Sequence, residues 1–174
     1  MRKLMLTLSL LCFFIIQANA QLGVMKLVGS DTKNYKLGFG AFIKAGVPVS
    51  KSGAVTIEIG VNYFPSKDEG EGTVMCPLKV GYRYMLNGTR EGFYVEPQVG
   101  YNLYGVTSLL DENSYNVDLE YHGVIFAAGG GYLFSIAQIP FNLNLRYETV
   151  IAHGGSNNLV SLGITKSFIF GKKD

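Results

Sequence analysis

Apolar and polar residues alternate along much of the chain, and this period of two constrains the fold more than any other feature of the sequence. In 55–64, 76–86 and 141–151 one parity is mostly apolar or aromatic, and the other is largely polar or glycine. Successive side chains of a β-strand point to opposite faces, so each segment predicts a strand with one apolar face. No segment beyond the first twenty residues shows a convincing helical period. The sequence therefore predicts an all-β fold.

The same pattern predicts eight strands in all. They are expected at 22–29, 35–46, 54–64, 73–86, 93–105, 122–134, 141–151 and 158–170, and the first of these has no clear parity. Short connectors at 48–53, 87–92 and 135–140 alternate with mostly longer, polar connectors at 30–34, 65–72, 106–121 and 152–157. Alternate connectors of an up-and-down barrel lie at the same end, so one end should carry tight turns and the other long loops. Pro77 and Pro97 lie within predicted strands and require a bulge or a locally broken pair.

The first twenty residues have the three parts of a signal peptide. Arg2 and Lys3 form a charged start, 4–16 are mostly apolar, and 18–20 form a small-x-small cleavage site. Cleavage would leave an exported barrel domain of residues 21–174. This domain holds one cysteine, Cys76, which excludes an internal disulfide and a multi-cysteine metal site. It has 13 basic residues (the 15 of the chain less two in the leader) against 13 acidic ones, and no basic stripe typical of nucleic-acid binding.

Alternation alone fits two kinds of barrel. A secreted, soluble, lipocalin-like barrel would turn its apolar parity inward around a small apolar ligand, whereas a membrane barrel would turn it outward against lipid. Aromatic residues favour the membrane barrel, because they gather toward both ends of the predicted strands and match the aromatic girdles of membrane interfaces. The predicted girdle residues are Tyr35, Tyr63, Tyr84, Phe93, Tyr101, Phe134, Phe141, Tyr147 and Phe168. Glycine is frequent on the polar parity, where it would leave room for long charged side chains in a narrow lumen.

The leader, the strand pattern, the aromatic placement and the last strand together resemble the small eight-stranded outer-membrane barrels of the OmpA/OmpX type. The last predicted strand ends in Ser-Phe-Ile-Phe at 167–170, which is similar to their C-terminal signature, although four residues follow it. Ala-Gln at 20–21 is similar to the cleavage junction of outer-membrane β-barrel-domain proteins of Bacteroidota. The resemblance implies an antiparallel, up-and-down transmembrane β-barrel in the outer membrane of a Gram-negative cell. It implies no particular activity, because this fold serves adhesive, structural and enzymatic roles.

Charged residues on the polar parity predict an ionic network inside the barrel. The six are Glu58, Lys79, Arg83, Glu96, Arg146 and Glu148. Pairing neighbouring strands through their connectors places Glu58 opposite Lys79 and Arg83 opposite Glu96. Eight strands enclose a space just wide enough for side chains to fill. We therefore predict a closed, charge-filled lumen rather than a pore.

No motif of a known enzymatic site is present, and we predict no catalytic residue, no cofactor and no metal ion. His153, Ser156 and Glu148 come nearest to a triad, as in outer-membrane lipid A deacylases, but their spacing matches that family poorly and they share no obvious face. A lipid-modifying enzyme is therefore the least favoured interpretation. The acidic loops at 65–72 and 106–121 could attract a divalent cation, although solvated loops are the simpler interpretation.

The favoured interpretation is a small, non-enzymatic outer-membrane barrel with a structural or surface-interaction role through the loops at 65–72 and 106–121. The expected partners are outer-membrane lipid and another envelope or extracellular protein, and no nucleic acid. The second interpretation is the soluble, lipocalin-like barrel described above.

Overall fold

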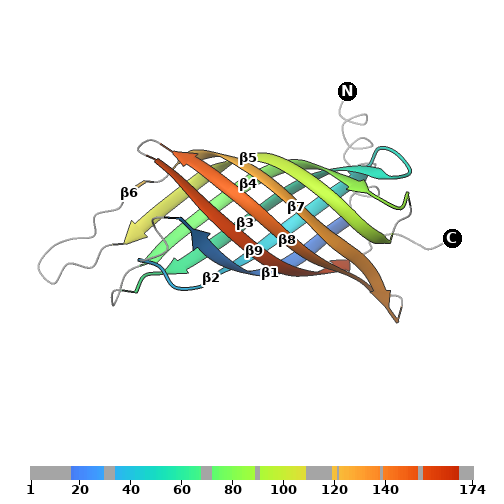
Figure 1. Cartoon of the computed structure of the whole chain (residues 1–174), viewed down its shortest axis with the longest axis horizontal. Helices are drawn as coiled ribbons and strands as arrows, with labels where there is room; N and C mark the ends of the chain where they lie inside the picture. Colours follow the sequence, from blue (N-terminus) through green and yellow to red (C-terminus); the bar gives the residue numbers. More distant parts are fainter. Residues whose placement is uncertain are drawn as a thin grey trace, which may run out of the picture.

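The alternating segments form a sheet that closes on itself (Figure 1). The computed structural model describes residues 17–29, 34–67, 72–88, 91–108, 119–120, 122–137, 139–152 and 155–168. The barrel strands are β1 (Gln17–Val28), β2 (Gly38–Pro48), β3 (Gly53–Pro65), β4 (Gly72–Met85), β5 (Gly92–Ser108), β7 (Gly123–Ile136), β8 (Ile139–Ala152) and β9 (Gly155–Phe168). The two-residue strand β6 (Leu119–Glu120) pairs only with the end of β5. Within the described ranges, no helix has the length and hydropathy needed to cross a bilayer.

Every barrel strand pairs antiparallel with two neighbours. The order is β4-β3-β2-β1-β9-β8-β7-β5, and the pairing of β4 with β5 closes the circle. The predicted fold, an all-β, eight-stranded antiparallel up-and-down barrel, is therefore confirmed. β1 begins at Gln17, five residues before the predicted start, and so runs across the expected cleavage junction. β9 begins at Gly155 rather than at 158, which shortens the preceding connector to 153–154.

The two ends of the barrel carry different connectors. At the tight-turn end lie the connectors 49–52, 86–91 and 137–138, together with the first residue of β1 and the last of β9. At the long-loop end lie the connectors 29–37, 66–71, 109–122 and 153–154. The Asn87-Gly88 turn shows why glycine is needed there, because Gly88 has a φ of 64°, which side chains disfavour.

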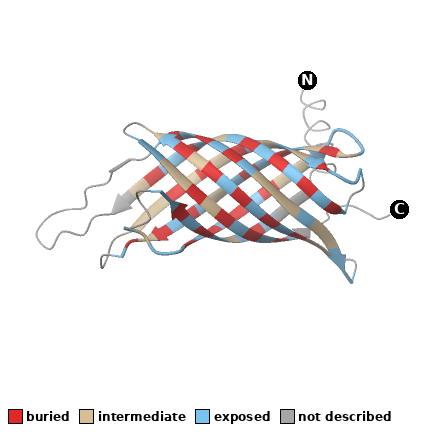
Figure 2. Ribbon diagram, viewed as in Figure 1, coloured by how far each residue is buried: buried red, intermediate tan, exposed pale blue. Residues whose placement is uncertain are grey.

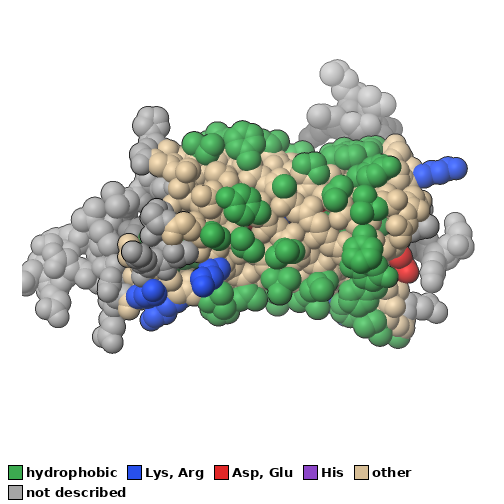
Figure 3. Space-filling model, viewed as in Figure 1, with side chains coloured by type: hydrophobic (Ala, Val, Ile, Leu, Met, Phe, Trp, Pro, Cys, Tyr) green, Lys and Arg blue, Asp and Glu red, His purple; other side chains and the backbone are tan. Residues whose placement is uncertain are grey.

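The apolar parity faces outward on all eight barrel strands. Buried and exposed residues alternate along the strands (Figure 2). Hydrophobic side chains are spread over the whole visible wall, and the Lys and Arg side chains in this view lie toward its two ends (Figure 3). Leu145 on β8 is 58% exposed and Ile57 on β3 is 50% exposed. Leu78 on β4, expected on the same face, is only half-buried. The inward parity is mostly polar and glycine, so the polarity of this barrel is the reverse of that of a soluble barrel.

Glycine on the inner face makes room for the side chains of the lumen. A Cβ added to Gly100 would lie 2.3 Å from the carbonyl oxygen of Leu78 and 2.6 Å from Cγ of Lys79. A Cβ added to Gly60 would lie 2.3 Å from the ring of Phe42. Small inner residues therefore let a narrow barrel hold long side chains.

Pro77 and Pro97, which lie in the interiors of β4 and β5, interrupt the hydrogen-bonded ladder as predicted. The register of β4 on β5 shifts between Cys76 and Pro77, whose partners are Tyr104 and Asn102, so one residue of β5 is extra. The same ladder breaks again between the pairs Gly81↔Gln98 and Tyr84↔Val95, which flank Pro97. A missing backbone donor is thus accommodated by a bulge at one proline and by a broken pair at the other.

Candidate functional site

The middle of the lumen holds a connected set of buried charges. Among the described residues seven charged side chains make this ionic network: Lys44, Glu58, Lys79, Arg83, Glu96, Arg146 and Glu148. They stand on the inward parity of β2, β3, β4, β5 and β8. With four cations and three carboxylates, the network has a formal charge of 4 − 3 = +1.

Two acids and two bases form a ring in which the charges alternate. Lys79 Nζ lies 2.9 Å from Glu58 Oε1 and 3.0 Å from Glu148 Oε2. Arg146 Nη1 donates to both carboxylate oxygens of Glu58 at 2.8 and 2.9 Å, and its Nε lies 2.7 Å from Glu148 Oε1. All four side chains are at least nine-tenths buried. Buried charges are stable only when they are paired in this way.

The ring joins strands on opposite sides of the barrel. β3 and β8 are four steps apart in either direction around the eight-stranded circle, so they are diametrically opposed. The bond between Glu58 on β3 and Arg146 on β8 therefore spans the lumen. Lys79 on β4 and Glu148 on β8 make a second contact across it.

Glu96 holds the remaining cations of the network. It forms ion pairs with Lys44 and with Arg83 Nε, the latter at 2.8 Å. It also accepts hydrogen bonds from Thr56 Oγ1 and Gln98 Nε2, both at 2.9 Å. The Oε1 atom of Gln98 accepts in turn from Arg146 Nη1 at 3.2 Å and so connects Glu96 to the ring. A single carboxylate thereby satisfies four side-chain donors.

The structure brings together all six of the charged residues predicted for the lumen. The predicted register is present, since Glu58 pairs with Lys79 and Arg83 contacts Glu96. The sequence analysis missed Lys44, although the alternation of the strand gives its position. Lys44 lies on the inward parity of β2, directly opposite Glu58.

An apolar cluster fills the lumen between the ionic network and the long-loop end. It consists of Met25, Leu27, Phe42, Phe64, Met75, Ile125, Val150 and Leu159. Phe64 and Val150 have no exposed surface. The ring of Phe42 lies 5.1 Å from Lys79 Nζ and 5.4 Å from Arg146 Cζ, so it joins the cluster to the charges by cation–π contacts. The sequence analysis did not anticipate this cluster.

Most of the aromatic residues predicted for the girdle lie on the outer face. Tyr63, Tyr84, Phe93, Tyr101 and Tyr147 are exposed, whereas Phe134 and Phe141 are half-buried and stacked on each other at 5.9 Å. Tyr35 departs from the expected position, because it precedes β2 and packs partly buried against the apolar cluster, where its hydroxyl accepts from Thr73. The backbone of Phe168 pairs with Ala18, and its side chain lies outside the described residues.

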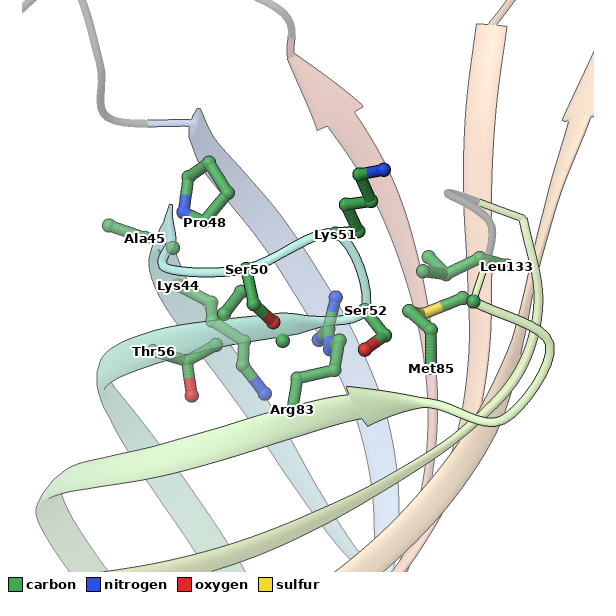
Figure 4. Close-up of a pocket in the computed structure, with 14 residues that line it drawn as sticks. Lys44, Ala45, Pro48, Ser50, Lys51, Ser52, Thr56, Arg83, Met85 and Leu133 are labelled. Carbon is green, nitrogen blue, oxygen red and sulfur yellow. The ribbon is translucent and has the colours of Figure 1, made fainter.

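At the tight-turn end the lumen opens into a cavity of about 460 Å³, here called the vestibule. Lys44, Arg83 and Lys51 line it, together with Ser50, Ser52 and Thr56 (Figure 4). Lys44 and Arg83 belong to the ionic network, so the vestibule ends on the charged layer. None of the described residues that line it is acidic.

Of the groups considered for chemistry, the two that the structure describes do not come together. Glu148 is buried in the lumen, whereas Ser156 is exposed, and His153 lies outside the described residues. Residues 68–71, 109–118 and 121 of the two acidic loops also lie outside them. In the described part of the chain, no group of three or more His, Cys, Asp or Glu is placed to hold a metal ion.

A closed eight-stranded barrel with an apolar outer wall and a charged interior has the fold of the small outer-membrane β-barrels, as the sequence resemblance predicted. No protein-family model matches the sequence, and no curated protein is significantly similar to it.

Solved structures share the fold at low sequence identity. Ail of Yersinia pestis, crystallised with the heparin analogue sucrose octasulfate, is 13% identical over 88% of this chain and 96% of its own, with a TM-score of 0.61. The N-terminal barrel of OprF from Pseudomonas aeruginosa is 11% identical over 87% and 97%, with a TM-score of 0.59. Neisserial surface protein A is 12% identical over 88% and 97%, with a TM-score of 0.58.

Proposed function

We propose that this protein is a non-enzymatic outer-membrane barrel with a closed lumen, which acts structurally or in surface interaction through its long loops. The observation that carries the proposal is the outer wall, where large apolar side chains are exposed on every barrel strand. Soluble monomers rarely expose contiguous apolar patches above a few hundred Å². A surface that is apolar around the whole circumference of the barrel is instead typical of a wall in contact with the acyl chains of a bilayer.

The same arrangement argues against the soluble, lipocalin-like alternative. Such a barrel needs an apolar interior with space for a ligand, whereas here the centre of the lumen holds charges tied to one another. The lipid-modifying alternative has no support from geometry, because Glu148 faces the lumen and Ser156 is exposed.

The proposal includes an orientation and an export route. In outer-membrane barrels the short turns face the periplasm and the longer loops face outward, so the vestibule would open to the periplasm. Cleavage after Ala20 would start β1 at Gln21, whose pairs with Phe42 and Thr165 would be retained. The barrel would then comprise residues 21–174.

Two layers support a closed lumen. The ionic network ties opposite walls together across the middle, and the apolar cluster fills the space toward the long-loop end. An ion would have to separate buried charge pairs and then cross an apolar layer. Both steps are costly, so we expect no steady conductance.

The long-loop end is where a surface partner would bind, and outer-membrane lipid would surround the wall. The shared fold with Ail, which was crystallised with a heparin analogue, supports interaction at the cell surface as a role for such a barrel. Another envelope or extracellular protein is the partner that we propose.

Insertion can be tested with the tyrosines of the outer wall. The chain has 11 tyrosines and no tryptophan, so its fluorescence reports on tyrosine alone. Protein refolded into vesicles of brominated phosphatidylcholine should lose most of this fluorescence relative to unbrominated vesicles, because Tyr63, Tyr101 and Tyr147 face outward. Equal fluorescence in both would favour the soluble alternative.

A second measurement tests closure separately. Folded protein should migrate differently on a gel before and after boiling, and the folded band should give no steady current in a planar bilayer. A large, constant conductance from that material would show that the lumen is open.

A further inference from the structure

The vestibule is large enough for a ligand, and the charged side chains in its described lining are all cations. Its volume of about 460 Å³ falls within the range of small-molecule sites. Lys44 from β2 and Arg83 from β4 reach into it from two sides, while Ser50 and Ser52 stand on the connector beside it (Figure 4). Lys51 lies on the same connector at the mouth. Three cations and several hydroxyls thus line one cavity, and the part of its lining that the structure describes holds no carboxylate.

The charges beneath the vestibule do not cancel its cations. Glu96 is shared by Lys44 and Arg83, so two cations meet one carboxylate. Lys44 also lies 3.4 Å from Glu58, but that carboxylate is already bound by Lys79 and Arg146. An excess positive charge therefore remains on the vestibule side of the network.

Arg83 is placed to bind an oxyanion. Its Nε is the atom that contacts Glu96, which leaves the terminal nitrogens of the guanidinium as donors for a ligand. The side chain is 15% exposed, so a ligand that reaches it would be largely shielded from water. Guanidinium groups bind phosphate and carboxylate oxygens in paired hydrogen bonds, which are strongest where water is excluded.

We propose that the vestibule binds a small, soluble molecule bearing an oxyanion, with a phosphate group as the best match to its donors. The cation excess attracts the anion, Arg83 and Lys44 bind its oxygens, and the serine hydroxyls complete the cavity wall. A phospholipid headgroup shares this chemistry, and cleavage after Ala20 would remove the part of β1 that pairs with 43–46 beside the vestibule. The test therefore has to separate a soluble phosphate from a lipid headgroup.

The site can be tested on the folded, full chain in uncharged maltoside micelles free of phospholipid. Inorganic phosphate and glycerol 3-phosphate are titrated at constant ionic strength, and amide NMR shifts are followed. We expect saturable shifts centred on Gly46 and on 50–53, with none from glycerol. Shifts that grow linearly without saturation, or that are spread over the barrel, would overturn the proposal. So would shifts that require anionic phospholipid vesicles, because the ligand would then be a lipid headgroup.

Gly46→Leu is the decisive variant. Gly46 lines the vestibule, and a Cβ there would meet nothing closer than 3.7 Å, so a side chain can start at this position without a close contact. Leucine would then occupy space in the cavity without changing any charge. In Gly46→Leu the apparent Kd for phosphate should rise at least about tenfold, because the cavity is filled. In Arg83→Gln it should rise about tenfold, as expected for the loss of one charge-assisted hydrogen bond. Lys51→Gln should weaken binding less, because Lys51 lies at the exposed mouth.

Lys36→Gln is the matched control. It removes one exposed lysine at the long-loop end, far from the vestibule, and should leave the Kd unchanged. Equal weakening by Lys36→Gln would show that only net charge matters, and an unchanged Kd in Gly46→Leu would show that the ligand is not in the vestibule. Arg83→Gln also removes a partner of Glu96 and can lower the folded yield. Gly46→Leu changes no charge, so it is the variant that decides whether the ligand binds in the vestibule.

Discussion

Replacing Glu96 tests how far the ionic network stabilises the barrel. Glu96 is 3% exposed and accepts contacts from Arg83, Lys44, Thr56 and Gln98. In Glu96→Ala the guanidinium of Arg83 loses this carboxylate, and Lys44 keeps only its longer contact with Glu58. Removing one partner of a buried ion pair typically costs about 3–5 kcal/mol. We expect the free energy of unfolding to fall by that amount.

Urea titration in phospholipid vesicles measures this loss, with the heat-dependent gel shift and circular dichroism as independent readouts of folding. Glu91→Ala is the control, because Glu91 is exposed and accepts a surface hydrogen bond from Ser135. It should cost about 1 kcal/mol or less. A loss in Glu96→Ala no larger than in the control would refute the view that the lumen depends on these pairs.

A double-mutant cycle sharpens the test. Glu96→Ala leaves Arg83 without its carboxylate, and Arg83→Ala removes one of the two cations that Glu96 holds, whereas the double variant removes the whole pair. We expect the double variant to be more stable than the sum of the two losses predicts, by about 1–3 kcal/mol. Strict additivity would mean that the 2.8 Å contact between them contributes no coupling.

Three further variants probe the wall, the inner glycines and the apolar cluster. Leu145→Arg puts a charge on the lipid face and should cost about 2–4 kcal/mol in vesicles if the residue lies near the midplane, whereas an equally stable variant would contradict lipid contact there. Gly100→Ala should cost about 1–3 kcal/mol by urea titration, because the added Cβ would clash with the carbonyl oxygen of Leu78. Gly46→Ala, on the same inner face, has room for its Cβ and should be nearly neutral. Similar losses in the two variants would exclude crowding as the cause. Phe64→Ala should cost about 3–5 kcal/mol by the same titration because its side chain is fully buried, and a change below about 1 kcal/mol would show that the cluster is not a packed core.

The sequence was sufficient for the architecture because the relevant information is local. Strand alternation decides which side chains share a face, and short connectors decide which residues of neighbouring strands meet. Glu58 and Lys79 could therefore be paired before the structure was known. The same reasoning placed a short connector at 87–92, where the structure has 86–91, and the interruptions at Pro77 and Pro97.

The composition of the lumen was harder to predict. Phe42, Phe64 and Val150 fall on the parity that was expected to be polar, and alternation alone does not say that they come together near one end of the barrel. Contacts across the lumen, such as that of Glu58 with Arg146, depend on how the closed sheet is staggered. The stagger of the closed sheet cannot be read from the alternation within one strand or from the length of one hairpin turn.

The bond that spans the lumen between β3 and β8 has a consequence for how the chain assembles. Its two residues are 88 positions apart, and neither strand is the neighbour of the other. An open sheet entering lipid would hold Glu58, Lys79 and Arg146 against hydrocarbon with no partner across the lumen, which is very costly. The sheet must therefore curl before or while it enters the bilayer, with its charged face turned inward on trapped water. The final zipping of β1 onto β9 would expel that water, so that closure and insertion become one cooperative event.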